Sequence, residues 1–371
     1  MPGRPLIVIA DDLTGAAEVG AIAQEHGLAA MVLTKVPRTP IAADVLVIDT
    51  DTRLARPAVA ARRVRRTALR LKQLPHGGIF KKTDSVLRGP VLAELKACTV
   101  ALGYTRALLV AGNPSLGRTI RDGRLFVAGR PIDRTAFAND PHHPLRHSSV
   151  LDLLGRNGDV VQLSSTDFLP RTGIIAGDHS SVTDARQWAA RVDSDTLPAG
   201  GADFFRAWLQ TRSRRIRCRT RPVAQAIPAL LLHGTSIAPT SNHLLRFSGL
   251  RPPLARGVAT ALRRHGAAVI AASPRTLNNP KAPAAVAAGF TRLVRSLRTA
   301  RAFRHLLIAG GATSAAVLRE LGWTRLQVIH LWGPGIVSLQ PSAAPDCIVT
   351  LKPGSYPWPA SLRRSLPRLF S

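Results

Sequence analysis

The chain has 371 residues, 45% of them apolar, which is enough to form a sizeable core and excludes a globally disordered protein. Its 51 basic and 22 acidic residues give a net charge of +29, which favours acidic partners such as nucleic acid, an anionic membrane or phosphorylated and carboxylated small molecules. The basic residues are spread along the chain, however, and the basic runs lack the interleaved aromatic residues typical of nucleic-acid sites. We therefore do not expect a nucleic-acid partner.

The three cysteines, Cys98, Cys218 and Cys347, lie far apart in the sequence, which argues against a disulfide framework or a structural zinc site. No uncharged apolar stretch is long enough to span a membrane, and the N-terminus does not resemble a signal peptide. These observations favour a cytoplasmic protein without a membrane partner. They are compatible with a homo-oligomer as well as with a monomer.

Short apolar runs alternate with helical patterns in the first half of the chain. Strands are predicted at 6–10, 29–33, 45–48, 107–111 and 173–176, and helices at 16–27, 57–74, 91–102 and 183–192. A change of pattern near Asp122-Gly123 predicts a β-hairpin. Strands that alternate with helices indicate a parallel sheet with crossover connections.

A basic run at 212–221 is the predicted linker to a second α/β unit. Beyond it, strands are predicted at 229–232, 267–271, 306–309 and 326–329, and helices at 255–265 and 282–303. We therefore predict an α/β fold made of two α/β domains with mainly parallel sheets, at residues 1–221 and 222–371.

The sequence LIVIADDLTGAAE, which begins at Leu6, contains the first candidate site. Its apolar run ends at two adjacent carboxylates, Asp11 and Asp12, and the helical pattern begins shortly after them. In open α/β sheets ligands bind outside the carboxyl ends of the strands, and a helix N-terminus there favours an anion. Carboxylates at this position suit a ligand with hydroxyl groups, a metal ion or both. The alternative is a helix N-cap, which would account for one of the two.

The second candidate site is the polar block from Lys81 to Gly89, KKTDSVLRG, between a strand and a helix. Its Arg88 has the chemistry for bidentate binding of a carboxylate. The alternative is a surface loop with incidental ion pairs.

Glycine loops that follow strands form the third candidate site. They are Gly310-Gly311, Gly333-Pro334-Gly335 and the loop that ends at Gly354. Glycines allow close approach of the backbone to a phosphate, and the helix that follows Gly311 contributes its dipole. Three such loops in one domain indicate a nucleotide site, although each alone could be a tight structural turn.

Together these motifs resemble the four-carbon acid sugar kinase family, whose members use ATP to phosphorylate threonate, erythronate or 3-oxo-tetronate. The resemblance extends over nearly the whole chain and is carried by IADDLTGAAE, FKKTDSVLRG and the segment from Asn113 to Ser149. It implies an N-terminal domain that binds the sugar acid, a C-terminal domain that binds the nucleotide, and a role in carbohydrate metabolism.

The resemblance also implies roles for individual residues. Asp11 and Asp12 would hold the substrate hydroxyls, and one of them would act as the base. The acid-binding pocket would be lined by Arg53, Lys82, Asp84 and Arg88, with Arg88 for the substrate carboxylate. The nucleotide contacts would be Thr235, Ser236, Thr240, Gly310, Gly311, Ala312, Thr313 and Gly354. Magnesium is implied because phosphoryl transfer depends on charge neutralisation, although no ligand cluster in the sequence shows a metal site.

The sequence departs from the family pattern in its nucleotide-binding half. Ile237 replaces a serine, Ala312 replaces an acidic residue, and Pro357 stands where the last loop has a glycine. The leading hypothesis is therefore an ATP-dependent kinase of a four-carbon sugar acid, and the alternative is a sugar-acid-binding homologue with a degraded nucleotide site.

Overall fold

The computed structural model describes residues 4–140, 142–155, 158–212, 227–234, 244–247, 252–272, 282–354 and 356–370. Its internal contacts divide the chain into two compact units. The first unit comprises Met1–Ala30 and Lys35–Cys218, and the second comprises Met31–Thr34 and Arg219–Ser371. The boundary predicted after residue 221 lies outside the described residues.

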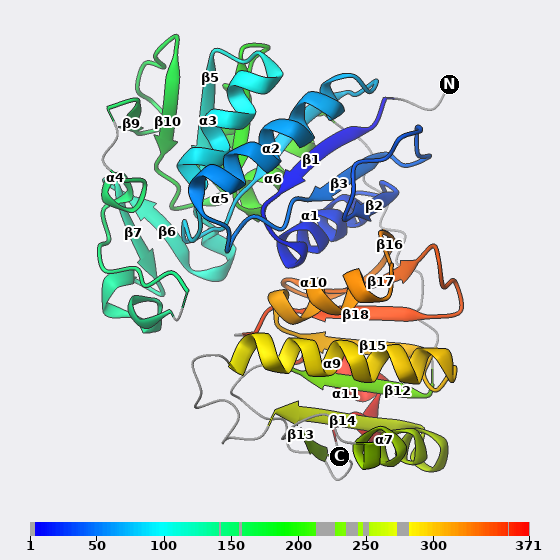
Figure 1. Cartoon of the computed structure of the whole chain (residues 1–371). Coiled ribbons are helices and arrows are strands. Elements are labelled where there is room, and N and C mark those ends of the chain that lie inside the picture. The colour runs from blue at the N-terminus through cyan, green and yellow to red at the C-terminus, as the bar shows by residue number, and fades with distance from the viewer. Residues whose placement is uncertain are drawn as a thin grey trace. The chain divides into compact units, whose positions relative to one another are not determined.

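A parallel sheet forms the centre of the first unit (Figure 1). The described strands lie side by side in the order β3 (Val45–Asp49), β1 (Leu6–Ala10), β4 (Gly78–Lys82), β11 (Thr196–Gly200), β5 (Arg106–Val110), β10 (Gly173–Gly177) and β9 (Val160–Leu163). In the register of β1, Ala10 is paired with Asp49 of β3 on one side and with Lys82 of β4 on the other. The carboxyl ends of these three strands therefore lie at one level, and the residues that follow them come together.

Helices cover both faces of this sheet. Successive side chains of a strand point to opposite faces, and Lys81 pairs with Glu94 of α3 (Val91–Leu102) whereas Lys82 pairs with Glu18 of α1 (Leu13–Glu25). Hence α3 and α1 lie on opposite faces. The helix α2 (Pro57–Lys72) packs beside α3, while α6 (Ala202–Arg212) packs against both α1 and α5 (Val182–Ala190). Buried aromatic rings of α6 surround Phe80 of β4.

The central strand β11 and the helix α6 were not predicted from the sequence. Pro198 lies inside β11, paired with Leu108 of β5, although proline is normally confined to edge strands because it cannot donate to the ladder. The neighbouring strand β4 pairs only with Ala199 and Gly200 of β11. Proline lacks a backbone N–H, but β4 does not pair with β11 at Pro198. The missing N–H therefore costs no hydrogen bond to β4.

The predicted hairpin is confirmed. β6 (Arg118–Arg121) pairs antiparallel with β7 (Arg124–Val127), and the two residues between them, Asp122 and Gly123, have positive φ angles of 50° and 65°. Two consecutive positive φ angles are typical of a type I′ turn, for which Asp-Gly is a preferred sequence.

The second unit contains a sheet that is parallel on one side and antiparallel on the other. Its described strands lie in the order β13 (Leu244–Phe247), β14 (Ala267–Ala272), β12 (Ala229–His233), β15 (His305–Ala309), β18 (Ile348–Lys352), β17 (Ile336–Pro341), β16 (Arg325–Gly333) and β2 (Ala30–Leu33). The first five run parallel, whereas β17, β16 and β2 are joined by antiparallel pairing. The prediction of two α/β domains with mainly parallel sheets is confirmed.

One of the glycine loops has a different role from the predicted one. Gly333-Pro334-Gly335 forms the tight turn of the antiparallel β16–β17 hairpin, and Gly335 has a φ of 66°. It is therefore a structural turn, and it does not follow one of the parallel strands. By contrast, Gly310 and Gly354 follow the parallel strands β15 and β18.

Helices of the second unit include α7 (Pro252–His265), α9 (Ala282–Thr299), α10 (Gly311–Glu320) and α11 (Ala360–Ser365). α9 packs against both α7 and α10 (Figure 1). Leu362 of α11 joins a buried cluster with Leu231, Val269 and Leu307 of the central strands. Within the described part of the chain, no helix combines the length and the apolar character that crossing a membrane requires.

We expect Gly200→Ala to destabilise the first unit strongly. A Cβ at this position, where φ is +157°, would lie 2.0 Å from the carbonyl oxygen of Val110, and the Gly200 carbonyl accepts a hydrogen bond from Thr83 in the candidate site. The backbone would have to move, which should cost about 3 kcal/mol or more. Urea unfolding measures the loss. Gly155→Ala is the matched control, since its φ is also positive and, among the described residues other than its chain neighbours, no atom lies within 4 Å of the added Cβ, so only about 1 kcal/mol is expected. Equal losses in the two variants would contradict the steric argument.

Candidate active site

Arg53, which follows β3, connects three carboxylates that follow the neighbouring strands β1 and β4. Its Nε and Nη2 atoms donate to the two carboxylate oxygens of Asp11 at 2.7 and 2.9 Å. Nη2 also lies 2.8 Å from Oδ1 of Asp12, and Nη1 lies 3.8 Å from Oδ1 of Asp84. The structure thus brings Asp11 and Asp12, which were expected to hold the substrate hydroxyls, together with Arg53 and Asp84, which were expected to line the acid-binding pocket.

Asp11 is the most deeply buried of these carboxylates. Burial alone would raise its pKa, but the charge and hydrogen bonds of Arg53 together with the charges of Lys81 and Lys82 outweigh this effect. The pKa of Asp11 is therefore lowered, and its side chain stays ionised at neutral pH. An ionised group with a lowered pKa binds and orients well but is a weak base.

Asp12 caps the helix α1 and also faces the site. One of its oxygens accepts a hydrogen bond from the backbone N–H of Gly15 at 2.9 Å, and the hydroxyl of Thr14 donates to the other. Its side chain is 16% exposed, against 4% for Asp11. The helix-cap and site interpretations are thus compatible, because the same carboxylate meets Arg53. Gly15 permits this crowding, since a Cβ there would lie 2.6 Å from Asp12 and 3.4 Å from Nζ of Lys82.

Arg88 is held by carboxylates of the chain itself. Its Nε and Nη2 donate to both oxygens of Asp84 at 2.8 and 3.1 Å, and its Nη1 donates to Asp140 at 3.2 Å. The guanidinium also lies over the ring of Phe137. Burial would raise the pKa of Asp84, but the charges of Arg88 and Arg53 hold it far below its usual value. The expected carboxylate-binding arginine therefore already has two carboxylate partners.

Lys81 and Lys82 serve opposite faces of the sheet. Nζ of Lys81 lies 2.7 Å from Glu94, and both side chains are almost completely buried. Burial would lower the pKa of Lys81, but the charges of Glu94 and Asp11 raise it. Nζ of Lys82 lies 3.4 Å from Glu18 and 3.4 Å from the position of a Cβ on Gly15. Lys82 is thus beside Asp12 and Arg53, whereas the side chain of Lys81 lies on the opposite face of the sheet, against α3.

The sequence analysis missed Asp49 as a member of this group. It is the last residue of β3 and is buried, and its carboxylate accepts one backbone hydrogen bond, from Asp51 at 2.8 Å. Burial, with the negative charges of Asp12, Asp51 and Asp11, raises its pKa well above the usual value. The sequence shows the polar residues 49–53 after the strand predicted at 45–48. It does not show that Asp49 is buried.

Residues far along the chain complete the surroundings of the site. Arg118 donates to the hydroxyl of Ser85 at 2.6 Å, and a ring nitrogen of His143 lies 2.9 Å from the carbonyl oxygen of Arg53. Asp140 reaches Arg88 from the same loop as His143. The loop that contains Asp140 and His143 therefore contributes to the site, which no spacing in the sequence indicated.

The second unit has a glycine-lined helix N-terminus at the carboxyl ends of β12 and β15. Gly310, with a φ of +110°, precedes α10, and no side chain caps the helix there. A Cβ on Gly234 would lie 2.4 Å from the hydroxyl of Thr313, so this loop needs glycine to pass the helix. Uncapped N–H groups at a helix N-terminus favour an anion such as a phosphate. Thr235, Ser236 and Thr240 lie outside the described residues.

Lys352 organises the loop that contains Gly354. Its Nζ donates to the carbonyl oxygens of Pro353 at 2.8 Å, Gly354 at 3.3 Å and Tyr356 at 2.5 Å. Its own carbonyl accepts the N–H of Gly310 at 2.9 Å, which connects the two glycine loops. Burial lowers the pKa of Lys352 to about 8. Gly310, which precedes the first helical residues Gly311, Ala312 and Thr313, is thus connected to the loop that contains Gly354.

No group of three or more histidine, cysteine or acidic side chains suited to a metal ion occurs among the residues that the structure describes. Mg²⁺ is commonly held by one or two carboxylates together with substrate phosphates, and it retains several waters. The magnesium expected from the family resemblance therefore does not require such a group.

Comparison with known families gives a match over most of the chain. Residues 6–194 match the model of a sugar-binding N-terminal domain, and residues 250–356 match that of a nucleotide-binding C-terminal domain. The chain belongs to the four-carbon acid sugar kinase family. The Asp11–Arg53–Asp84 group lies in the first of these family domains, and the glycine loop at Gly310 lies in the second.

Relatives within this family differ in how much of the chain they match. A D-erythronate kinase of Heliobacterium modesticaldum is 32% identical over 46% of this chain and 39% of its own length. A D-threonate kinase of Salmonella typhimurium is 34% identical over 42% of this chain and 37% of its own length. The matched part thus spans about two-fifths of these relatives. A 3-oxo-tetronate kinase of Methylobacterium radiotolerans is 26% identical over 94% of this chain and 95% of its own length.

Solved structures share the fold at low identity. A Salmonella typhimurium protein has a TM-score of 0.77 at 19% identity, covering 99% of this chain and 100% of that one. The Haemophilus influenzae protein HI1011 has a TM-score of 0.70, also at 19% identity, with coverage of 97% and 99%. At these identities the likeness concerns the fold alone.

We expect Asp49→Asn to stabilise the protein at neutral pH. Because the folded chain raises the pKa of Asp49, folding favours the protonated form, and stability is lost as the pH rises from the unfolded to the folded pKa. Asparagine removes this loss and can keep the hydrogen bond from Asp51. The Tm should rise by about 2–4 °C at pH 7, and the gain should vanish below about pH 4. Calorimetry across this range tests it, and a gain that does not change with pH would contradict it.

Removing one partner of the buried Lys81–Glu94 pair should lower the free energy of unfolding far more than removing both partners. Lys81→Met leaves the carboxylate of Glu94 buried without its counter-charge, which should cost about 3–5 kcal/mol. The double variant Lys81→Met, Glu94→Leu should recover most of this loss. Urea unfolding of both variants and of Glu94→Leu completes the cycle. A double variant no more stable than Lys81→Met alone would show that the pair is not the source of the loss.

Proposed function

We propose that this protein is an ATP-dependent kinase that phosphorylates a hydroxyl group of a four-carbon sugar acid. The observation that carries the proposal is the group of three carboxylates around Arg53 at the carboxyl ends of β1, β3 and β4. The carboxylates of this group can accept hydrogen bonds from substrate hydroxyls. The cations beside them can bind the substrate carboxylate. The names of the family relatives, which are kinases of D-erythronate, D-threonate and 3-oxo-tetronate, support the same reaction.

On this proposal, the first unit binds the sugar acid through negatively and positively charged side chains. Asp11 and Asp12 accept hydrogen bonds from substrate hydroxyls, and Lys82 and Arg53 balance their charge. Arg88 binds the substrate carboxylate, since a guanidinium offers two parallel donors. Such a site discriminates strongly between hydroxyl patterns, because a missing hydroxyl leaves a buried acceptor unpaired.

We assign the role of base to Asp12 and not to Asp11. Asp11 accepts two hydrogen bonds from Arg53, is nearly buried and has a lowered pKa. Asp12 is the more exposed of the two and lies next to Lys82. In phosphoryl transfer most of the rate comes from positioning and charge neutralisation, and the base completes it by accepting the proton of the attacking hydroxyl.

The second unit, on the same proposal, binds ATP. The uncapped N-terminus of α10 at Gly310 and Gly311 would receive phosphates, and the Lys352 loop would hold Gly354 in place. Magnesium would neutralise phosphate charge in the bound nucleotide. The expected cytoplasmic location and the absence of a nucleic-acid partner stay predictions.

The purified full chain tests the proposal when it is incubated with ATP, magnesium and each of D-threonate, D-erythronate and 3-oxo-tetronate. ADP should form with at least one acid. Asp12→Asn keeps a good helix cap and should lower kcat by about 10²–10⁴-fold with a smaller effect on KM. Glu25→Gln, at the other end of the same helix, is the control and should leave both constants unchanged.

Two results would contradict the proposal. ADP formation with none of the acids would exclude the activity, and an unchanged kcat in Asp12→Asn would exclude the assigned base. Calorimetry with ATP and with the acids separately then identifies the reason. Binding of an acid without binding of ATP would favour the homologue with a degraded nucleotide site, whose sequence departures include Ala312 and Pro357.

A further inference from the structure

The ammonium group of Lys352 lies inside the loop that follows β18. Its Nζ donates to the carbonyl oxygens of Pro353 at 2.8 Å, Gly354 at 3.3 Å and Tyr356 at 2.5 Å. A lysine ammonium has three N–H donors and no acceptor, so its donors are matched by the three carbonyl oxygens of one short loop. Lys352 itself is 2% exposed. The loop is therefore folded around a buried positive charge.

Backbone carbonyl groups, and no carboxylate of the described residues, stabilise this charge. Burial alone lowers the pKa of Lys352, without a contribution from a charged side chain. A buried charge that lacks an ion partner requires hydrogen bonds to the charged group, and the loop provides them. The Nζ atom also lies over the ring of Trp358, 5.3 Å from its centroid, and an aromatic face favours a cation. The charge and the shape of the loop therefore depend on each other.

The turn of the β16–β17 hairpin, Gly333-Pro334-Gly335, packs against the same loop. A Cβ on Gly335 would lie 3.0 Å from Cγ of Pro353 and 3.3 Å from the ring of Tyr356. Both distances are shorter than an ordinary van der Waals contact between carbon atoms, so glycine permits the close approach of the turn. The loop is therefore restrained by the ammonium group of Lys352 and by the hairpin turn.

The hydrogen bonds of Lys352 also set the direction of a backbone N–H group. In a planar trans peptide the C=O and N–H bonds point in opposite directions. Because the carbonyl of Pro353 is directed at Nζ, the N–H of Gly354 points away from it. The carbonyl of Lys352 accepts the N–H of Gly310, which precedes the uncapped N-terminus of α10. The N–H groups of Gly354 and of the first turn of α10 therefore belong to neighbouring segments, an arrangement that favours an anion.

We propose that Lys352 is a positioning residue for ATP, whose ammonium group holds the loop after β18 in the shape that directs the N–H of Gly354 toward a phosphate of the nucleotide. The inference rests on the proposed function, because it requires the second unit to bind ATP. The three donors of Lys352 are used within the loop, so its side chain acts through Gly354. Without the charge the carbonyl oxygens lose their donors, the loop changes shape and the affinity for the nucleotide falls.

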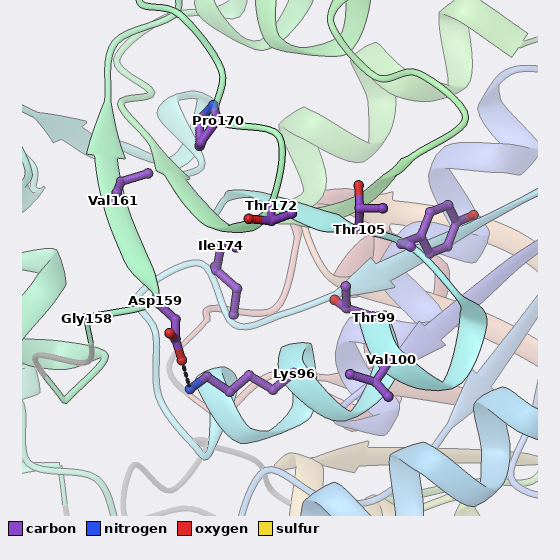
Figure 2. Close-up of a pocket in the computed structure, with 12 residues that line it drawn as sticks. Lys96, Thr99, Val100, Thr105, Gly158, Asp159, Val161, Pro170, Thr172 and Ile174 are labelled. Carbon is purple, nitrogen blue, oxygen red and sulfur yellow. Dashed lines mark hydrogen bonds and ion pairs between the residues drawn. The ribbon is translucent and has the colours of Figure 1, made fainter.

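Calorimetric titration of the full chain with ATP and magnesium tests the proposal. Lys352→Met removes the N–H donors and should raise the Kd for ATP by about 10-fold or more, as expected when a hydrogen bond to a charged group is lost. The kcat at saturating ATP should change little, because the loss concerns binding. Lys96→Met is the matched control, since Lys96 forms an ion pair with Asp159 in the first unit (Figure 2), and it should leave Kd unchanged. Equal Kd values for the wild-type chain and Lys352→Met would overturn the proposal.

The pH dependence of the wild-type Kd tests the same ammonium group without a substitution. The pKa of Lys352 is about 8, so at about pH 9 roughly a tenth of the chains keep the charge, and Kd should be about 10-fold higher than at pH 7. None of the titratable or charged side chains on the described elements that pack against β18 and its loop contributes to this pKa; they are His305, Arg319, Glu320, Tyr356, Arg363 and Arg364. Lys352→Met should show no such rise.

The outcomes separate this inference from the proposed function. A wild-type Kd that is equal at the two pH values, or an equal rise in Lys352→Met, would overturn the role of Lys352 and leave ATP binding intact. A wild-type chain that binds no ATP at either pH would contradict the proposed function, and the inference with it. The wild-type pH profile decides the matter even where Lys352→Met does not fold.

Discussion

The arrangement of the first unit depends on one guanidinium among buried carboxylates. Asp11, Asp12 and Asp84 follow neighbouring parallel strands and would repel one another in a site of low exposure. Arg53 is within 2.9 Å of the first two and 3.8 Å from the third. A lysine has the same charge but lacks the planar fork of donors that meets two carboxylates at once. An arginine at this position therefore meets all three carboxylates at once, which the single ammonium group of a lysine would not do.

The backbone is organised to place Arg53 there. The N–H groups of Thr52 and Arg53 both donate to the carbonyl oxygen of Asp11, at 2.9 and 3.1 Å, so the loop after β3 folds over the end of β1. The carbonyl oxygen of Arg53 meets a ring nitrogen of His143 and lies 2.9 Å from the position of a Cβ on Gly89. Segments that are distant in sequence thus converge on one residue, and the glycine is required by close approach.

This convergence explains what the sequence could and could not predict. Burial on both faces of a parallel sheet gives apolar runs such as 6–10 and 45–48 that are easily recognised, and the carboxylates of β1 and the block after β4 follow from where those runs end. The strand β11 escaped prediction because Pro198 contradicts the usual rule for central strands. Asp49 and Asp140 escaped because burial and the path of a long loop determine their roles, and neither has a local sequence pattern.

The partners of Arg88 suggest how a charged substrate would enter this site. Each of the three guanidinium nitrogens of Arg88 donates one N–H to Asp84 or Asp140, so a substrate carboxylate that takes two parallel donors in place of these partners has to displace one of the two aspartates. Asp84 accepts two hydrogen bonds from the guanidinium and one from the backbone N–H of Arg88, and its charge is also balanced by Arg53. Asp140 accepts one guanidinium bond, at 3.2 Å, and retains the N–H groups of His142 and His143 when that bond is lost. Exchange at Asp140 therefore costs less, and it leaves Asp84 in place to hold Arg88 toward the substrate.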